Sequence, residues 1–145
     1  PLLPLLTDHA AQVVVVIHAK HARELDDAVC RRLREFRSRG ITLLNQSVLL
    51  RGVNDSVSAL KKLSERLFEC GVLPYYIHQL DPVAGAAHFY VPDEVALTLM
   101  NALRESLPGY LVPRLVREAE GATSKLSVGE PRSSKDPVAP MRPSS

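Results

Sequence analysis

The sequence lacks the features that define several large classes of protein. It has no tryptophan and only 5% aromatic residues, and 18 Lys and Arg against 16 Asp and Glu give a formal charge of +2. A protein that binds nucleic acid through bulk charge has a larger, clustered basic excess, so we expect no nucleic-acid partner. No apolar run approaches the roughly 20 residues that span a bilayer, so we expect no membrane partner either.

Cysteine is also scarce. Cys30 and Cys70 form no CxxC motif and, by their number and spacing, no disulfide framework, which is typical of a reducing cytoplasm. Two cysteines cannot by themselves hold an iron–sulfur cluster or a Cys-rich zinc site. Residues 1–6 have no basic lead and no small-residue cleavage site, so the sequence predicts no signal peptide.

The composition divides the chain into one domain and a tail. With 145 residues, of which 46% are apolar, the chain can bury the core of one domain. Residues 129–145 are rich in proline and serine and almost without bulky apolar side chains. Such a segment buries too little surface to offset its ordering entropy. We therefore predict a domain over residues 1–128 and a disordered tail over 129–145.

Within the domain, short β-branched runs alternate with amphipathic helical patterns. The sequence predicts strands at 12–17, 41–44, 73–77 and 111–116, and helices at 25–36, 56–68 and 92–107. Strands that begin about 30 residues apart and alternate with helices form a parallel sheet through right-handed crossovers. The predicted class is therefore α/β with four parallel strands, which is half of a (β/α) barrel or a small open sheet.

Polar residues follow each predicted strand. They are His18 to His21 after the first, Asn45 to Ser47 after the second, His78 to Asp81 after the third, and Glu118, Glu120 and Lys125 after the fourth. Ligands of parallel α/β proteins bind at the carboxyl ends of the strands, so this pattern predicts a small-molecule site at one rim.

Each of these residues also has a structural explanation. His18 and the histidine three positions later could be satisfied within their loop or bind zinc. Asn45 and Gln46 lie in an apolar setting, where the two amides could serve a ligand, a buried network or capping. Asp81 precedes proline, as is typical of turns, and Lys125 is by composition a surface lysine.

Two long strings resemble a known family. Residues 40–55 read Gly-Ile-Thr-Leu-Leu-Asn-Gln-Ser-Val-Leu-Leu-Arg-Gly-Val-Asn-Asp, and residues 74–81 read Pro-Tyr-Tyr-Ile-His-Gln-Leu-Asp. With Gly85, the His-Phe pair at 88–89, residues 109–113 and the later Lys125, they resemble the C-terminal half of the lysine 2,3-aminomutases. The resemblance covers about residues 5–128 and is greatest to the branch that serves β-lysylation of elongation factor P.

The resemblance implies an isomerase that converts α-lysine to (R)-β-lysine by radical amino migration. Its cofactors would be pyridoxal phosphate, S-adenosylmethionine and a 4Fe-4S cluster. By position, Lys125 would bind pyridoxal phosphate as a Schiff base. Asp81 and Glu118 would hold the distal ammonium of the substrate lysine, and His18 and Gln46 would lie against S-adenosylmethionine.

The chain also departs from the family. The CxxxCxxC motif that holds the cluster is absent, as are the basic residues that would bind the pyridoxal phosphate and the substrate carboxylate. The resemblance assigns them to an N-terminal half of the barrel, so we expect the isolated chain to be inactive. An open half-barrel would expose apolar surface and self-associate, including as a homo-oligomer. The alternative is a non-catalytic α/β module that binds a ligand or a partner chain.

Overall fold

The computed structural model describes residues 12–81, 87–118 and 125–127. Its strands form one sheet in the order β1-β2-β3-β4-β5. The strands are β1 (Val14–Ile17), β2 (Thr42–Leu49), β3 (Leu73–Gln79), β4 (Arg114–Glu118) and β5 (Lys125–Ser127). The helices are α2 (Asp27–Ser38), α3 (Val57–Glu69) and α4 (Asp93–Ser106), with short 3-10 turns η1 (Ala22–Glu24), η2 (Ala87–Phe89) and η3 (Gly109–Leu111).

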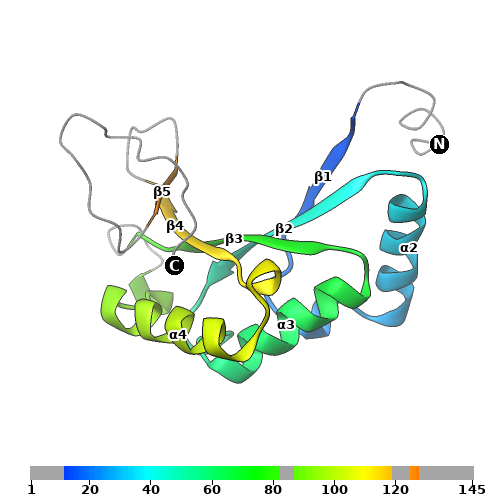
Figure 1. Ribbon diagram of the computed structural model, residues 1–145. Helices are drawn as coiled ribbons and strands as arrows, with labels where there is room; N and C mark the ends of the chain where they lie inside the picture. The colour runs from blue at the N-terminus through cyan, green and yellow to red at the C-terminus, as the bar shows by residue number, and fades with distance from the viewer. Residues whose placement is uncertain (1–11, 82–86, 119–124, 128–145) are drawn as a thin grey trace.

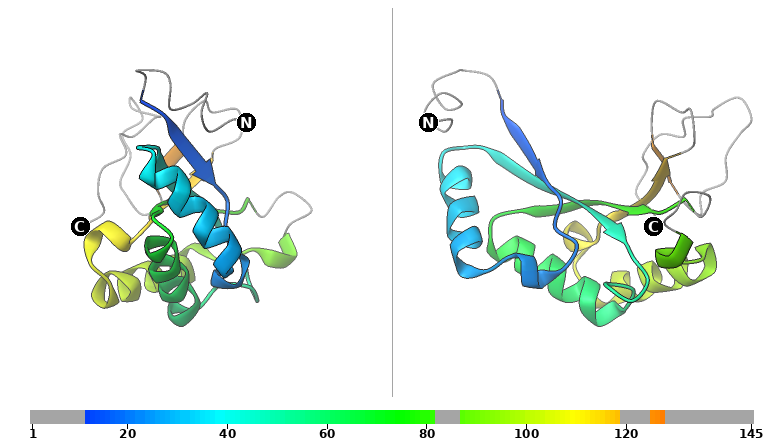
Figure 2. Two further views of the ribbon diagram at one scale, coloured as in Figure 1. Left: turned by 90° about the vertical axis from the view of Figure 1, so that its right-hand side faces the viewer. Right: turned by 180° about the vertical axis from the view of Figure 1, so that it is seen from behind.

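Four strands and three helices confirm the predicted α/β class. β1 to β4 pair in parallel, each with the next strand in the chain, and a helix lies in each connection. β5 was not predicted. It pairs antiparallel with β4, with Glu118 opposite Lys125. The result is an open, curved sheet whose first strand, β1, lies at one end (Figures 1 and 2).

The helices all cover the same face of the sheet, on the lower side in Figure 1. One apolar cluster joins α2 and the end of α3 to β1 and β2, and includes Leu33, Leu43 and Leu67. A second joins α3 and α4 to the later strands, and includes Leu60, Ile77 and Met100. Both clusters lie between helices and sheet, and none of the helices in the described ranges covers the opposite face.

Local signals set the ends of the helices. The Asp26 and Ser56 side chains accept hydrogen bonds from Val29 N at 2.9 Å and Ala59 N at 3.1 Å, which caps α2 and α3. The two helices end before Gly40 and Gly71, whose φ values of 84° and 81° favour glycine. These glycines return the chain to the sheet, so β2 and β3 begin at the same end.

Several strand boundaries differ from the prediction. β3 continues to Gln79, so His78 and Gln79 lie inside this strand and do not follow it. β2 continues to Leu49, so Asn45, Gln46 and Ser47 lie inside the strand and do not follow it. β4 begins at Arg114, because the predicted start at 111 falls in η3 and Pro113 has no N–H to donate. The register of β2 on β3 also shifts at Asn45/Gln46, next to Pro74, which likewise cannot donate.

The prediction for the cysteines was wrong. Cys30 on α2 and Cys70 at the end of α3 form a disulfide, with Cα atoms 4.7 Å apart and side chains 3% and 0% exposed. The two positions are 40 residues apart in sequence, and only the tertiary fold brings α2 to the C-terminal end of α3. The predicted tail at 129–145 lies outside the described residues. No helix among those that are described has the length and apolarity needed to cross a membrane.

Candidate functional site

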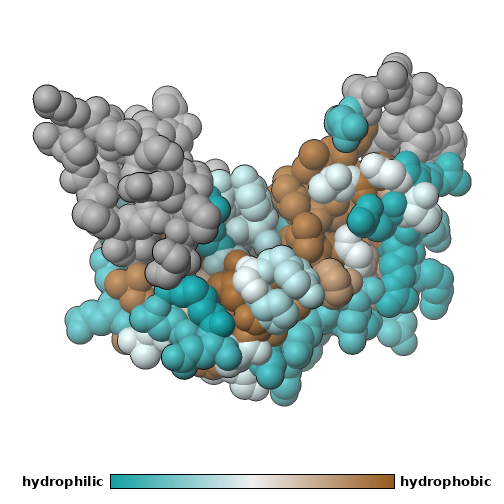
Figure 3. Space-filling model, in the orientation of Figure 1, coloured by the Kyte–Doolittle hydropathy of each residue, from teal (hydrophilic) through white to brown (hydrophobic). Residues whose placement is uncertain are grey.

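The uncovered face of the sheet carries the first predicted site residue. Along β2, Leu43, Asn45, Ser47 and Leu49 are buried, whereas Leu44, Gln46 and Val48 between them are only partly buried. Successive side chains of a strand point to opposite faces, so Gln46 lies on the face away from the helices. Figure 3 shows this hollowed side of the molecule, where apolar surface gathers over β1 and β2.

Three further polar residues share this face with Gln46. His78 was among the residues expected at the rim, whereas Tyr76 and Arg114 were not expected at a site. Gln46 is the register partner of Tyr76, and Tyr76 that of Arg114, so the three residues form a row across β2, β3 and β4. His78 lies two residues further along β3, and its ring is 6.0 Å from that of Tyr76. Strand alternation along β3 puts His78 on the same face as Tyr76, but the row across β2, β3 and β4 follows only from the register between the strands.

Tyr76 is the most perturbed group of the row. Its side chain is 8% exposed, and its ring centroid is 4.0 Å from that of Tyr75. Burial, followed by the hydrogen bond to Tyr75, raises the pKa of Tyr76 to about 12, although the nearby Arg114 charge acts in the opposite direction. Tyr76 is therefore a neutral phenol throughout the physiological range and acts as a hydrogen-bonding group there.

Asn45 holds the loop that carries His18. Its side chain is 2% exposed. Its Oδ1 accepts from Ala19 N at 2.8 Å, and its Nδ2 donates to Ala19 O at 3.1 Å. Both amide groups are thus satisfied by the residue directly after His18. Of the alternatives open from sequence, the structure favours a buried network for Asn45, and this network fixes the backbone beside His18.

Asn54 makes a second such clamp on the same loop. Its Nδ2 donates to Lys20 O and to Val48 O, both at 2.9 Å, and its Oδ1 accepts from Leu50 N at 2.8 Å. The Asn54 side chain is 1% exposed. The buried Asn54 amide therefore joins the loop after β1 to the end of β2. It fixes the position of these two parts of the candidate site relative to each other.

His21 has a structural role in this loop. Its Nδ1 accepts from Arg23 N at 3.2 Å and caps η1, while Glu24 Oε2 accepts from Lys20 N at 2.7 Å and His21 N at 2.8 Å. Over the ranges that the structure describes, no three His, Cys, Asp or Glu residues come together as metal ligands. The arrangement gives no support to a zinc site at His18 and His21.

The structure places the five predicted site residues in three groups along the sheet. His18 and Gln46 directly follow the register partners Ile17 and Asn45, so they are neighbours across β1 and β2. Asp81 follows β3. The last two, Glu118 and Lys125, are register partners on β4 and β5. The groups therefore follow the strand order, with Asp81 between the other two.

The neighbouring Gln79 belongs to the helical side of the sheet. Its Nε2 donates to Val91 O at 2.8 Å and to Asp93 Oδ1 at 2.6 Å. Asp93 also lies 3.4 Å from the Arg117 guanidinium on β4. These contacts join β3 and β4 to the start of α4, so they stabilise the site from the helical side of the sheet.

Comparison with solved structures gives the class of fold. The chain resembles a radical SAM methyltransferase from Sphaerobacter thermophilus with a TM-score of 0.59 and 17% identity, covering 81% of this chain and 37% of that one. At this identity the likeness concerns the fold alone. The open parallel sheet with its helices on one face is thus a fold that occurs within a radical SAM enzyme.

Comparison with curated sequences is more specific. The chain is 50% identical over 114 residues to an L-lysine 2,3-aminomutase of Escherichia coli and 44% over 126 residues to that of Haemophilus influenzae. It is 39% identical over 111 residues to that of Clostridium subterminale. No family model matches the chain. These relatives confirm the resemblance to the lysine 2,3-aminomutases.

The match covers most of this chain but a minor part of each relative. The E. coli alignment spans 79% of the chain and 33% of the relative, and the H. influenzae alignment spans 87% and 37%. The chain therefore corresponds to about a third of the length of these proteins.

Proposed function

We propose that this chain forms one side of the catalytic site of a lysine 2,3-aminomutase that converts L-lysine to (R)-β-lysine for the modification of elongation factor P. The observation that carries the proposal is the 50% identity over 114 residues to an L-lysine 2,3-aminomutase. The places of His18, Asp81 and Glu118 support it, because each lies at or just after the carboxyl end of a parallel strand.

The substrate side of the proposed site lies around β3 to β5. Asp81 and Glu118 are the carboxylates that would hold the distal ammonium of lysine, since a cation leaving water needs an opposite charge to offset its desolvation. The register of β4 and β5 sets the backbone positions of Glu118 and Lys125 opposite each other. The distance between the Glu118 carboxylate and Lys125 would then select the length of the substrate.

Lys125 is the residue proposed to hold pyridoxal phosphate, because a lysine amine can form a Schiff base with the aldehyde of that group. It begins β5, at the position opposite Glu118 on β4. When bound, pyridoxal phosphate supplies electron delocalisation at the substrate nitrogen. The protein would place that nitrogen and exclude water from it.

The S-adenosylmethionine side would lie at His18 and Gln46. Both positions are held by backbone that Asn45 and Asn54 clamp, so a ligand would meet a preorganised edge. The residues present do not fit a 4Fe-4S cluster. Cluster ligands are free cysteine thiolates, and the two cysteines of this chain are bonded to each other on the helical side. Another segment must supply these ligands.

A graft into the E. coli relative tests the proposal. The chain replaces the matching third of that enzyme, and β-lysine formation from L-lysine is measured by chromatography. We expect turnover, with loss of at least about a hundredfold in Asp81→Asn, Glu118→Gln and Lys125→Arg, as for groups that act on the substrate directly. Glu105→Gln, an exposed carboxylate on α4, is the matched control.

A folded graft without turnover would contradict the proposal, as would site variants that behave like the Glu105→Gln control. Borohydride reduction in the presence of pyridoxal phosphate gives a second readout that needs no turnover. Peptide mapping of the graft should show Lys125 labelled well above Lys61 and Lys62. Equal labelling of the three lysines would argue against the role of Lys125.

A further inference from the structure

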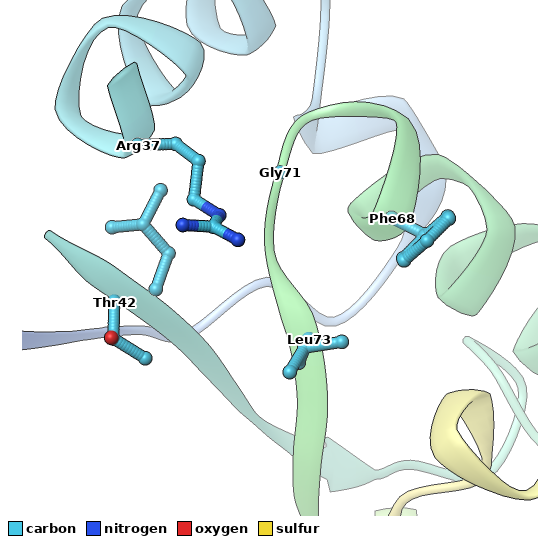
Figure 4. Close-up of a pocket in the computed structure, with 6 residues that line it drawn as sticks. Arg37, Thr42, Phe68, Gly71 and Leu73 are labelled. Carbon is cyan, nitrogen blue, oxygen red and sulfur yellow. The ribbon is translucent and has the colours of Figure 1, made fainter. Parts of the chain in front are cut away.

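A pocket lies at the end of the sheet opposite to the proposed catalytic rim. It has a volume of about 320 Å³ and is lined by Arg37, Thr42, Leu43, Phe68, Gly71 and Leu73. Thr42 and Leu73 are the first residues of β2 and β3, so the pocket opens between the amino ends of these strands (Figure 4). None of its lining residues has been assigned above to the proposed aminomutase site.

Arg37 gives the pocket its charge. Figure 4 shows its guanidinium reaching from the end of α2 towards the space between Thr42 and Leu73. No described carboxylate pairs with Arg37 across the ranges that the structure covers. The nearby Arg34, in contrast, donates from Nε to Glu69 O at 2.8 Å. The Arg37 guanidinium is thus a permanent positive charge to which a ligand anion can bind.

Gly71 makes room for this arginine. A Cβ at position 71 would lie 3.3 Å from both Cβ and Cγ of Arg37, which is tighter than ordinary packing. The positive φ of Gly71 and this close approach both favour glycine. The hydrocarbon stem of Arg37 can therefore lie over the turn between α3 and β3, and its head reaches the pocket.

The remaining walls are mostly apolar. Phe68 and Leu73 are 49% and 39% exposed, whereas Leu43 is 1% exposed at the base of the site. The Thr42 side chain adds one hydroxyl. No carboxylate lines the pocket, so an ammonium group would find no partner there. A zwitterionic amino acid such as lysine therefore suits this pocket poorly.

We propose that this pocket is a second binding site, which takes a small carboxylate with an aromatic or branched aliphatic group. The carboxylate would bind Arg37 and accept from Thr42, and the apolar group would contact Phe68, Leu43 and Leu73. A volume of about 320 Å³ is at the lower end of the range for small-molecule sites. Phenylacetate, a small aromatic carboxylate, is therefore the probe.

Titration of the ¹⁵N-labelled full chain with phenylacetate tests the proposal. We expect saturable shifts at Thr42, Gly71 and Leu73, with a Kd of about a millimolar for a ligand of this size. Phenylacetamide has the same shape without the charge and should bind about tenfold more weakly or worse. Because this comparison uses the unaltered chain, it does not depend on the folding of any variant.

Two arginine variants then test whether Arg37 is the group that binds the carboxylate. Arg37→Gln keeps most of the stem over Gly71 and should lose phenylacetate binding by about tenfold or more. Arg39→Gln removes an exposed arginine two residues away, outside the lining residues, and should bind as the original chain does. Absence of saturable shifts, equal binding of acid and amide, or unchanged binding in Arg37→Gln would each overturn the proposal.

Discussion

The Asn54 side chain makes three hydrogen bonds, to Leu50 N, Lys20 O and Val48 O, from a position 1% exposed. We expect Asn54→Ala to destabilise the chain by about 2–4 kcal/mol, because it leaves buried backbone groups without partners. Urea unfolding measures this loss. Asn101→Ala, at an exposed position of α4, should change stability by less than about 0.5 kcal/mol. Equal losses in both variants would contradict the clamp.

The raised pKa of Tyr76 predicts that the unfolding free energy of the chain falls with pH in the alkaline range. Its pKa is raised from 10.0 to about 12 in the folded chain, so the folded state keeps its proton where the unfolded state has lost it. The contribution of Tyr76 to the unfolding free energy is fully present below pH 10 and is lost as the pH rises through 12. We expect Tyr76→Phe to flatten the fall in unfolding free energy over this window, which is on the order of 2–3 kcal/mol. Unfolding curves from pH 9 to 12 provide the measurement. An equally steep fall in Tyr76→Phe would contradict the assignment to this phenol.

At the scale of elements, periodicity predicted four strands and three helices but not all of their ends. The apolar faces of α2, α3 and α4 depend on local sequence, and they were found. The length of β2 was missed, because Asn45 and Ser47 are polar residues inside a strand and their partners come from other elements. β5 was missed since three residues carry too little pattern, and pairing with β4 defines the strand.

The candidate site shows the same limit. His18, Gln46 and Asp81 could be named from motif and order along the chain. Tyr76 and Arg114 could not, because their place beside Gln46 depends on the register across β2, β3 and β4. That register includes a shift at Asn45/Gln46, and a shift of one residue exchanges the two faces of a strand.

The link between α2 and α3 gives an element-scale prediction. The disulfide joins Cys30 to Cys70, which are 40 residues apart. Closing a loop of that length in the unfolded chain stabilises the folded state by roughly 3–4 kcal/mol. We expect dithiothreitol to lower the unfolding free energy by up to this amount in urea titrations. The Cys30→Ala/Cys70→Ala double variant should not respond to the reductant. An unchanged stability of the original chain on reduction would contradict the link.

At the scale of the whole molecule, the sheet has helices on one face and an open face on the other (Figures 1 and 2). The face away from the helices carries Gln46, which belongs to the proposed site, together with Tyr76, His78 and Arg114. A barrel wall in a longer enzyme has this character, because its inner face is covered by the rest of the barrel. Among the described residues, this face is exposed at β1.

The end strand β1 makes this exposure testable. Within the described part of the sheet, β1 pairs on one side only, and Val14 and Val16 are 54% and 37% exposed. Residues 13–17 contain neither charge nor proline, the devices that usually protect a free edge. We therefore expect the 145-residue chain to self-associate as its concentration rises, as measured by sedimentation velocity.

A charged substitution on this edge should weaken association between copies without unfolding the chain. Val16→Lys places a cation on the exposed face of β1, and should shift the monomer–oligomer equilibrium at least about tenfold towards monomer. Val95→Lys, at a 46% exposed valine on α4, is the matched control and should associate like the original chain. Equal association in both variants would place the contact elsewhere. A chain that stays monomeric at high concentration would show that the edge is protected in another way. Disruption by Val16→Lys alone would place the contact between copies at β1.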